Sequence, residues 1–154
     1  MTPPLTDGVR IERASPADAE ALLALIERAQ LPSDGLASHL DAALVAREGE
    51  RIIGSAAIEV YEDGGLLRSV AVEADRRGTG LGAQLTAAAI EDARRRALPA
   101  LYLLTTTAER FFPRFGFERI SRGEVPASVQ ASIEFREACP ASATVMRKRL
   151  TGPV

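Results

Sequence analysis

The sequence of 154 residues predicts an α/β (α+β) fold in which helices flank a mostly antiparallel sheet. Three apolar runs follow one another across short polar or glycine-containing turns, which is typical of an antiparallel meander. Two longer stretches, one before and one after these runs, carry apolar residues at helical spacing. Further strand patterns follow the second helix, so strands and helices belong to one mixed architecture.

The first elements are a strand and a helix. We expect Val9–Arg13 to form the strand, and Ser15 to be the N-cap of a helix whose first helical position is Pro16. One face of this helix is apolar, because four residues fall at i, i+3, i+4 and i+7: Leu22, Leu25, Ile26 and Ala29. Pro32 ends the helix, and a second, short helix is expected over residues 35–40.

The three successive strands are expected over residues 42–47, 51–60 and 66–72. A long helix follows from about residue 79 to residue 97, and Ala100–Thr105 forms the next strand.

The last third alternates short elements. A short helix over residues 107–112 is expected to end there, because Pro113 disfavours helical geometry in the residue before it. Residues 115–120 lead into a strand, residues 125–135 form a helical excursion, and residues 143–150 form the closing strand. No repeat or second domain is visible. We therefore expect a single domain over residues 1–154, with residues 1–8 as a flexible tail.

Composition and charge exclude several functional classes. The formal net charge is −2 at pH 7, so no strong field favours nucleic acid or anionic lipid. No apolar stretch approaches the roughly 20 residues of a membrane-spanning helix. The single cysteine, Cys139, cannot form an internal disulfide, which fits a reducing compartment, and we expect a cytoplasmic protein without nucleic-acid or membrane partners. The sequence leaves the oligomeric state open, with a homodimer among the states that it allows.

The strongest functional signal is a glycine alternation after the third of the successive strands. Gly78, Gly80 and Gly82 stand where this strand gives way to the long helix, so the backbone can approach a ligand closely. The N–H groups and the dipole at the helix start favour a phosphate or pyrophosphate. A P-loop requires a lysine after its glycines, and none follows here. The dinucleotide fingerprint has a different glycine spacing. Three interpretations are left open: an acyl-CoA site, a nucleotide site, or a turn without any ligand.

Two motifs carry a resemblance to a known family. One is similar to the pyrophosphate loop of the GNAT N-acetyltransferases, Arg/Gln-x-x-Gly-x-Gly/Ala, and it runs Arg77-Gly78-Thr79-Gly80-Leu81-Gly82. The other, residues 108–117, resembles the family's Ala-x-x-Phe-Tyr-x-x-x-Gly-Phe. The resemblance covers nearly the whole chain. It implies the GNAT fold, a mixed, mostly antiparallel central sheet splayed after the fourth strand, and it implies acetyl-CoA as co-substrate.

A narrower resemblance involves three further segments. Residues 66–69, 104–108 and 139–143 resemble a bacterial subfamily of arsenic-resistance-type N-acetyltransferases. This resemblance implies detoxification, with an organoarsenical or a related toxic amino acid as the acceptor.

The family resemblance assigns roles to particular positions. The backbone of Val70 and Val72 would pair with the pantetheine arm and polarise the thioester carbonyl. The full set of expected cofactor-binding residues is Val70, Ala71, Val72, Arg77, Gly78, Thr79, Gly80, Leu81, Gly82, Ala83, Thr106 and Phe112. Thr105, beside the pantetheine groove, is expected to contact the acceptor, although it can equally cap the following helix.

Phe112 departs from the family pattern. The family usually has tyrosine at this position, which donates a proton to the departing thiolate, and phenylalanine cannot do so. A thiol of pKa about 8.5 leaves as thiolate at a cost of about 2 kcal/mol at pH 7, so an unassisted departure is affordable. Ser69 or a threonine, acting through water, is the alternative. The third alternative is a protein that does not catalyse.

Two charged residues interrupt the apolar strands. We expect Arg68 to lie on the same face as Leu66 and Val70, with Glu59 on a neighbouring strand close to it. One interpretation is a salt bridge at the splayed sheet. The other is an acceptor site, in which Glu59 receives the amine proton, directly or through water, and Arg68 binds an acidic group of the substrate.

The cost of deprotonation favours a small acceptor. At pH 7 it is roughly 4.6 kcal/mol for a lysine amine and roughly 1.4 kcal/mol for a peptide-type α-amine. No histidine stands near the motifs, since His39 precedes the second strand and is expected to have a packing role. No metal site is expected. The sequence thus predicts an acetyl-CoA-dependent N-acetyltransferase that acts on a small, amino-acid-like amine by direct transfer. A silent acyl-CoA sensor and acetylation of a protein amine are the alternatives.

Overall fold

The computed structural model describes residues 8–31, 33, 35–132 and 143–150. Several expectations therefore lie outside the described residues: the tail apart from Gly8, the helix end at Pro32, the last part of the helix over residues 125–135, and the loop around Cys139.

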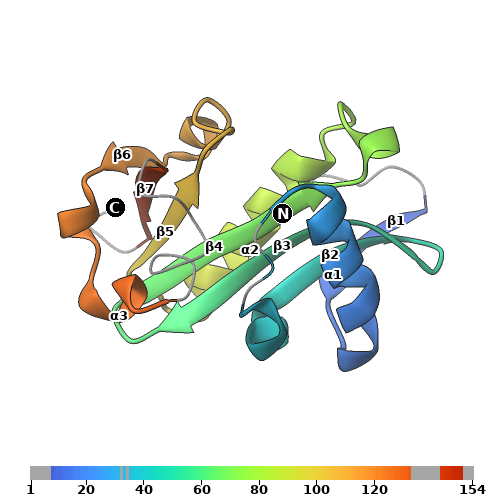
Figure 1. Ribbon diagram of the computed structural model, residues 1–154, viewed down its shortest axis with the longest axis horizontal. Helices are drawn as coiled ribbons and strands as arrows, with labels where there is room; N and C mark the ends of the chain where they lie inside the picture. The colour runs from blue at the N-terminus through green and yellow to red at the C-terminus, as the bar shows by residue number, and fades with distance from the viewer. Residues whose placement is uncertain (1–7, 32, 34, 133–142, 151–154) are drawn as a thin grey trace.

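A seven-stranded sheet forms the centre of the described structure (Figure 1). Its strands are β1 (Val9–Arg13), β2 (Ala43–Glu48), β3 (Arg51–Tyr61), β4 (Gly64–Val72), β5 (Ala100–Thr105), β6 (Glu118–Ile120) and β7 (Thr144–Arg149). Their spatial order is β1-β2-β3-β4-β5-β7-β6. Every neighbouring pair is antiparallel except β4 and β5, which are parallel. The expected mixed, mostly antiparallel sheet is confirmed.

The sheet opens between its two parallel strands. β4 and β5 pair only where they begin, with Gly65 opposite Leu101 and Leu66 opposite Tyr102. Beyond this point the two strands diverge (Figure 1), so the rest of β4 has a strand partner on the β3 side alone among the described residues. The splay expected after the fourth strand is therefore present.

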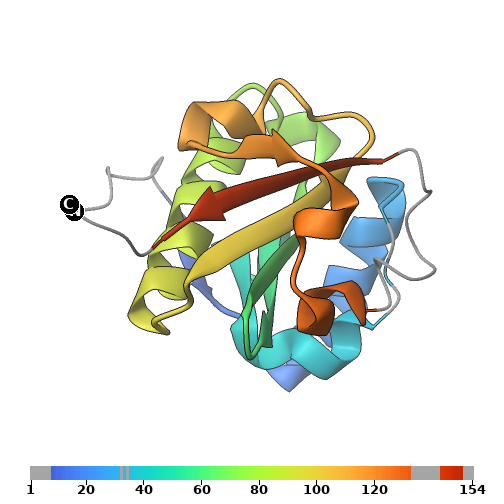
Figure 2. The same ribbon diagram turned by 90° about the vertical axis from the view of Figure 1, so that its left-hand side faces the viewer.

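Helices cover both faces of the sheet. Helix α2 (Leu81–Arg95) packs on one face, and α1 (Ala19–Arg28) with the 3-10 helix η2 (Leu36–Ala42) packs on the other (Figure 2). The short helix α3 (Ala127–Gln130) covers β5 and β7 on this second face, through Val129. Gly54 in β3 allows the close approach of α2, since a Cβ there would lie 2.7 Å from the Leu85 side chain.

The expected elements are confirmed with one exception and with end shifts of a few residues. The helix expected over residues 35–40 is the 3-10 helix η2, and the described part of the excursion over residues 125–135 contains α3. The prediction of a helix over residues 107–112 is wrong. A 3-10 helix, η4, spans Phe112–Phe115 instead. Pro113 stands in its first turn, where the missing N–H has no intrahelical partner to lose.

Candidate active site

The glycine-rich segment forms the connection from β4 to α2. A 3-10 turn, η3 (Ala74–Arg76), follows β4, and Gly78 and Gly80 then adopt left-handed backbone with φ of 83° and 85°. Gly80 is the N-cap residue of α2, and the Thr79 hydroxyl donates a hydrogen bond to the carbonyl of Arg76 at 2.7 Å. The free N–H groups of a 15-residue helix therefore start directly behind two glycines.

A pocket of about 370 Å³ lies against this segment. Its lining residues are Val72, Arg76, Arg77, Gly78, Gly80, Leu81, Gly82, Ala83, Phe111 and Arg114. Three of them are arginines, and the N-terminus of α2 contributes a further partial positive charge. The pocket therefore suits a polyanion such as a pyrophosphate.

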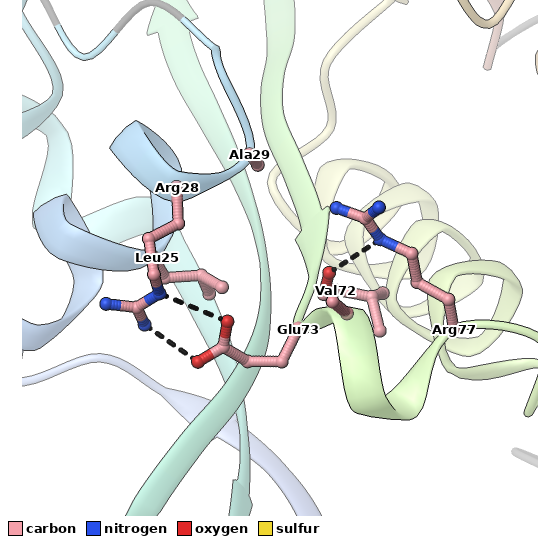
Figure 3. A pocket seen from close by; sticks show the side chains of 7 residues that line it. Leu25, Arg28, Ala29, Val72, Glu73 and Arg77 are labelled. Carbon is pink, nitrogen blue, oxygen red and sulfur yellow. Dashed lines mark hydrogen bonds and ion pairs between the residues drawn. The ribbon is translucent and has the colours of Figure 1, made fainter.

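Arg77 separates this pocket from a second one of about 330 Å³, because its side chain lines both. Figure 3 shows the second pocket between the end of α1 and the end of β4, with Arg28 hydrogen-bonded to Glu73. The Arg77 guanidinium donates from Nε to the carbonyl of Val72 at 3.3 Å (Figure 3). The side chain thus lies along the last residue of β4.

Arg76, Phe111 and Arg114 also line the pocket of about 370 Å³, although the sequence does not mark them as site residues. The Arg114 guanidinium carbon lies 5.8 Å from the centre of the Phe111 ring, a cation–π geometry. Phe111 and Arg114 both belong to the Phe-Phe-Pro-Arg segment at residues 111–114, which also contains Phe112.

Five of the expected cofactor-binding residues do not line this pocket: Val70, Ala71, Thr79, Thr106 and Phe112. Phe112 is 7% exposed and belongs to the main core, with edge-on contacts to the rings of Phe111 and Phe117. The Thr105 hydroxyl accepts the backbone N–H of Ala108 at 2.9 Å, so it caps the turn after β5. Thr106 is exposed beside it.

A β-bulge in β4 decides which side chains face which helix. Ala57 pairs with Arg68 whereas Ser55 pairs with Ala71, so β4 holds one residue more than β3 between these pairs, and Ser69 has a φ of 58°. Val70 and Val72 then pack toward the α2 face, and Ala71 packs toward α1. The expectation that Val70 shares a face with Arg68 and Leu66 is therefore wrong, because strict alternation ends at the bulge.

Glu59 and Arg68 meet on the face opposite α2. The Arg68 Nη1 donates to Glu59 Oε2 at 2.7 Å, and Arg68 Nε donates to the Ser69 hydroxyl at 3.2 Å. The Tyr61 hydroxyl donates to Glu59 Oε1. Burial, followed by the hydrogen bond to the Glu59 carboxylate, raises the pKa of Tyr61, so this phenol stays protonated. The expected proximity of Glu59 and Arg68 is confirmed.

His39 extends this polar cluster toward the surface. Its Nε2 lies 3.6 Å from Glu59 Oε1, and its ring centre is 6.1 Å from that of Tyr61. The sequence predicts a packing role for His39 away from the motifs and gives no sign of its place beside Glu59. No sequence spacing could have revealed it, because η2 approaches β3 only through the tertiary fold.

The described part of the chain contains neither a candidate metal site nor a candidate membrane-spanning helix. No group of histidine, cysteine and acidic side chains is arranged to hold a metal ion there. No described helix is both long and apolar enough to cross a membrane.

Comparison with known proteins gives a family and a fold. Residues 39–119 match the model of the acetyltransferase (GNAT) domain. No curated protein matches the sequence.

Among solved structures, N-acetylglutamate synthase from Neisseria gonorrhoeae, in complex with coenzyme A and N-acetyl-glutamate, superposes with a TM-score of 0.80 at 23% identity. The match covers 94% of this chain and 35% of that one, so the chain spans about a third of the synthase. Rv2747 from Mycobacterium tuberculosis, in complex with CoA, gives 0.76 at 23% identity over 92% and 99% of the two chains. A Klebsiella pneumoniae protein named as an acyl-CoA N-acyltransferase gives 0.70 at 26% identity over 93% and 98%.

Proposed function

The chain belongs to the acetyltransferase (GNAT) family, and on that premise we propose that it transfers the acetyl group of acetyl-CoA directly to the amine of a small, amino-acid-like acceptor. The observation that carries this proposal is the pocket of about 370 Å³, in which glycines, arginines and a helix N-terminus adjoin the splay between β4 and β5. The pocket supplies a site for a pyrophosphate. The splay leaves backbone groups of β4 without a β5 partner.

The cofactor's other half would run along β4. Val70 and Val72 lie beyond the last β4–β5 pair, so their backbone is available to the amides of a pantetheine arm. The bulge at Ser69 turns one backbone unit out of the regular ladder, next to where the thioester would then lie. An N–H held in a fixed direction stabilises the negative charge that develops on a carbonyl oxygen under attack.

Departure of the CoA thiolate proceeds without a phenol at position 112. Phe112 is packed in the core and has no proton to donate. Leaving as thiolate costs about 2 kcal/mol at pH 7 relative to a protonated product, which is small against an ordinary enzymatic barrier. We assign assistance to the departing thiolate to the Ser69 hydroxyl on β4, acting through water.

The acceptor amine would bind on the face that carries Glu59, with its proton passing to the cluster around this carboxylate. Arg68 fixes the carboxylate in place, and in this proposal its guanidinium also attracts an acidic group of the acceptor. In this proposal Thr105, the last residue of β5, also contacts the acceptor. An amino-acid-like acceptor is further supported by the fold relative from Neisseria gonorrhoeae, whose complex contains N-acetyl-glutamate. An organoarsenical amino acid belongs to the same chemical class.

Thiol release tests the proposal. The full chain is incubated with acetyl-CoA and a panel of amino acids, organoarsenical amino acids and simple alkylamines, and free thiol is measured with and without each amine. We expect amine-dependent release for at least one amino-acid-like acceptor and weaker release for alkylamines. CoA binding by calorimetry without any amine-dependent release would favour a silent acyl-CoA sensor, the alternative that Phe112 suggests. Release with peptide lysines alone would favour a protein acceptor.

A further inference from the structure

His39 is the single histidine of the chain, and it lies where the buried polar cluster approaches the surface. It belongs to η2, where its φ of −124° and ψ of 24° interrupt the helical backbone. Its side chain is 28% exposed, whereas the side chains of Glu59 and Arg68 are 3% and 0% exposed. A molecule arriving from solvent therefore meets the imidazole before it meets the carboxylate.

The partners of Glu59 make it better suited to stabilise a cation than to take up a proton. One carboxylate oxygen is bonded to Arg68 Nη1 at 2.7 Å, and the other accepts from the Tyr61 hydroxyl. Protonating this carboxylate would leave a buried guanidinium without its counter-charge, which is unfavourable. An imidazolium beside Oε1, in contrast, would add a favourable charge pair at the edge of the cluster.

We propose that His39 accepts the proton of the attacking amine and that Glu59 is the positioning residue that orients the imidazole. This inference rests on the proposed acetyl transfer. Nε2 faces Glu59, so the proton acceptor is Nδ1, with the hydrogen on Nε2 directed toward Oε1. The arrangement differs from a direct role for Glu59, because the group that accepts the amine proton is the partly exposed imidazole.

The step balances in protons and electrons. The amine lone pair forms the new N–C bond to the thioester carbon, and the C–S bond breaks with its electron pair leaving on the CoA sulfur. The proton released from the amine nitrogen moves to Nδ1 of His39. The imidazolium then returns the proton to solvent or to the thiolate, which restores the neutral imidazole for the next turnover.

The groups around the imidazole are known for the described part of the chain. Glu59 and Tyr61 face it from β3, and Arg68 lies behind Glu59 on β4. Asp41 is the acidic residue of its own element, with its backbone carbonyl bonded to Arg13 and Arg96. Because burial and the Glu59 carboxylate raise the pKa of Tyr61, this phenol does not compete for the amine proton, and the loss of turnover at acid pH that a general base produces is assigned to His39 in this proposal.

The test compares His39→Gln with Asp41→Asn, an exposed residue of the same element η2, in the full chain, with the best amino-acid acceptor from the thiol-release panel. Glutamine keeps a polar side chain but cannot take up a proton. We expect His39→Gln to lower kcat by about 100-fold, to remove the acid limb of the kcat–pH profile, and to leave the calorimetric affinity for CoA unchanged. Asp41→Asn keeps the imidazole and its contact with Glu59, and it should leave kcat within about threefold of the wild-type value with the acid limb retained.

Two results separate the possible failures. Wild-type kcat and an unaltered acid limb in His39→Gln would overturn the role of His39 while leaving acetyl transfer intact. No amine-dependent thiol release from the wild-type chain would overturn acetyl transfer and this inference together. His39→Asn, with a melting temperature measured beside that of His39→Gln, provides a second variant in case one of them fails to fold.

Discussion

The two sides of β4 are constructed in different ways. On the proposed cofactor side, most of the pocket comes from one contiguous segment between Val72 and Ala83, and backbone N–H groups and arginines would supply the binding groups. On the acceptor side, the polar groups are side chains from η2, β3 and β4, and the central ones are buried. We therefore expect the first side to tolerate side-chain changes that leave its backbone free, and the second to depend on the buried pair of Glu59 and Arg68.

The largest expected effect is the loss of Arg68. Arg68→Met should lower the free energy of unfolding by about 3–5 kcal/mol, because Glu59 would be left as a buried charge without its counter-charge. Denaturant unfolding followed by circular dichroism measures this. The double variant Glu59→Gln with Arg68→Met should recover a large part of the loss.

An exposed ion pair gives the matched control for that experiment. Arg28 also binds a carboxylate at 2.7 Å, that of Glu73, but its side chain is 56% exposed. Arg28→Met should therefore cost no more than about 1 kcal/mol. Equal losses for Arg28→Met and Arg68→Met would contradict the difference drawn here between the two sides of β4.

The second largest effect is expected at Gly82, on the cofactor side. A Cβ at this position would lie 3.7 Å from Val72 and 3.9 Å from Phe111, which are ordinary contacts, and the backbone needs no left-handed conformation. Gly82→Val should therefore fold but place its side chain in the pyrophosphate pocket. We expect the calorimetric affinity for CoA to fall by about 100-fold or more, which is about 2.7 kcal/mol.

Gly123 provides the control for Gly82. Nothing lies within 4 Å of a Cβ added at Gly123, and this residue lines neither pocket, so Gly123→Val should bind CoA normally. Gly80→Val is a less direct test, because its φ of 85° adds backbone strain to any steric effect. CoA affinity that is unchanged in Gly82→Val would remove this pocket from the proposed cofactor site.

The same difference explains what the sequence could predict. The glycine loop and the seven strands follow from local patterns, and β5 was predicted to the residue as Ala100–Thr105. The splay of the sheet was predicted only from the resemblance to the GNAT family. The helix predicted over residues 107–112 is absent, because the rule for residues before a proline is only a preference, and Pro113 stands in the first turn of η4 instead of after a helix end.

The features that sequence reasoning missed depend on tertiary structure. The bulge at Ser69 reverses the alternation of side chains along β4. Nothing in the local sequence marks Ser69 as the strand residue with a φ of 58°. His39 reaches Glu59 only because η2 packs over β3, and Arg114 reaches the glycine loop only because η4 folds beside it. The pairing of Glu59 with Arg68 was predictable, since antiparallel neighbours place their side chains together.

A smaller effect is expected from an ion pair that lines neither pocket. Arg47 hydrogen bonds, followed by the backbone N–H of Ser15, lower the pKa of Asp18 in the folded state. A lowered folded-state pKa means that this stabilisation is complete above the unfolded value, about pH 4, and is lost as the pH falls through the lower folded value. Asp18→Asn should therefore cost about 1–2 kcal/mol at pH 7 and progressively less on acidification.

Chemical denaturation at pH 7 and at pH 3 measures that difference, and the CoA affinity of Asp18→Asn at pH 7 should equal that of the wild-type chain. A stability loss of the same size at both pH values would show that asparagine perturbs packing rather than charge. This pH dependence of stability is separate from the acid limb of turnover assigned to His39, so the two can be measured in the same variants.

The smallest expected effect concerns Arg114 on the cofactor side. Its guanidinium lies over the Phe111 ring and lines the pocket, but the glycine loop and the α2 N-terminus hold a pyrophosphate mainly through backbone groups. Arg114→Ala should therefore weaken CoA binding by only about 3- to 10-fold, up to 1.4 kcal/mol, and the loss should shrink at high salt because the pocket is open to solvent. Arg110→Ala, an exposed arginine four residues earlier that does not line the pocket, should bind CoA as the wild-type chain does. A loss of 100-fold or more in Arg114→Ala would mean that a single side chain holds the cofactor, and that the cofactor side depends on side chains as the acceptor side does.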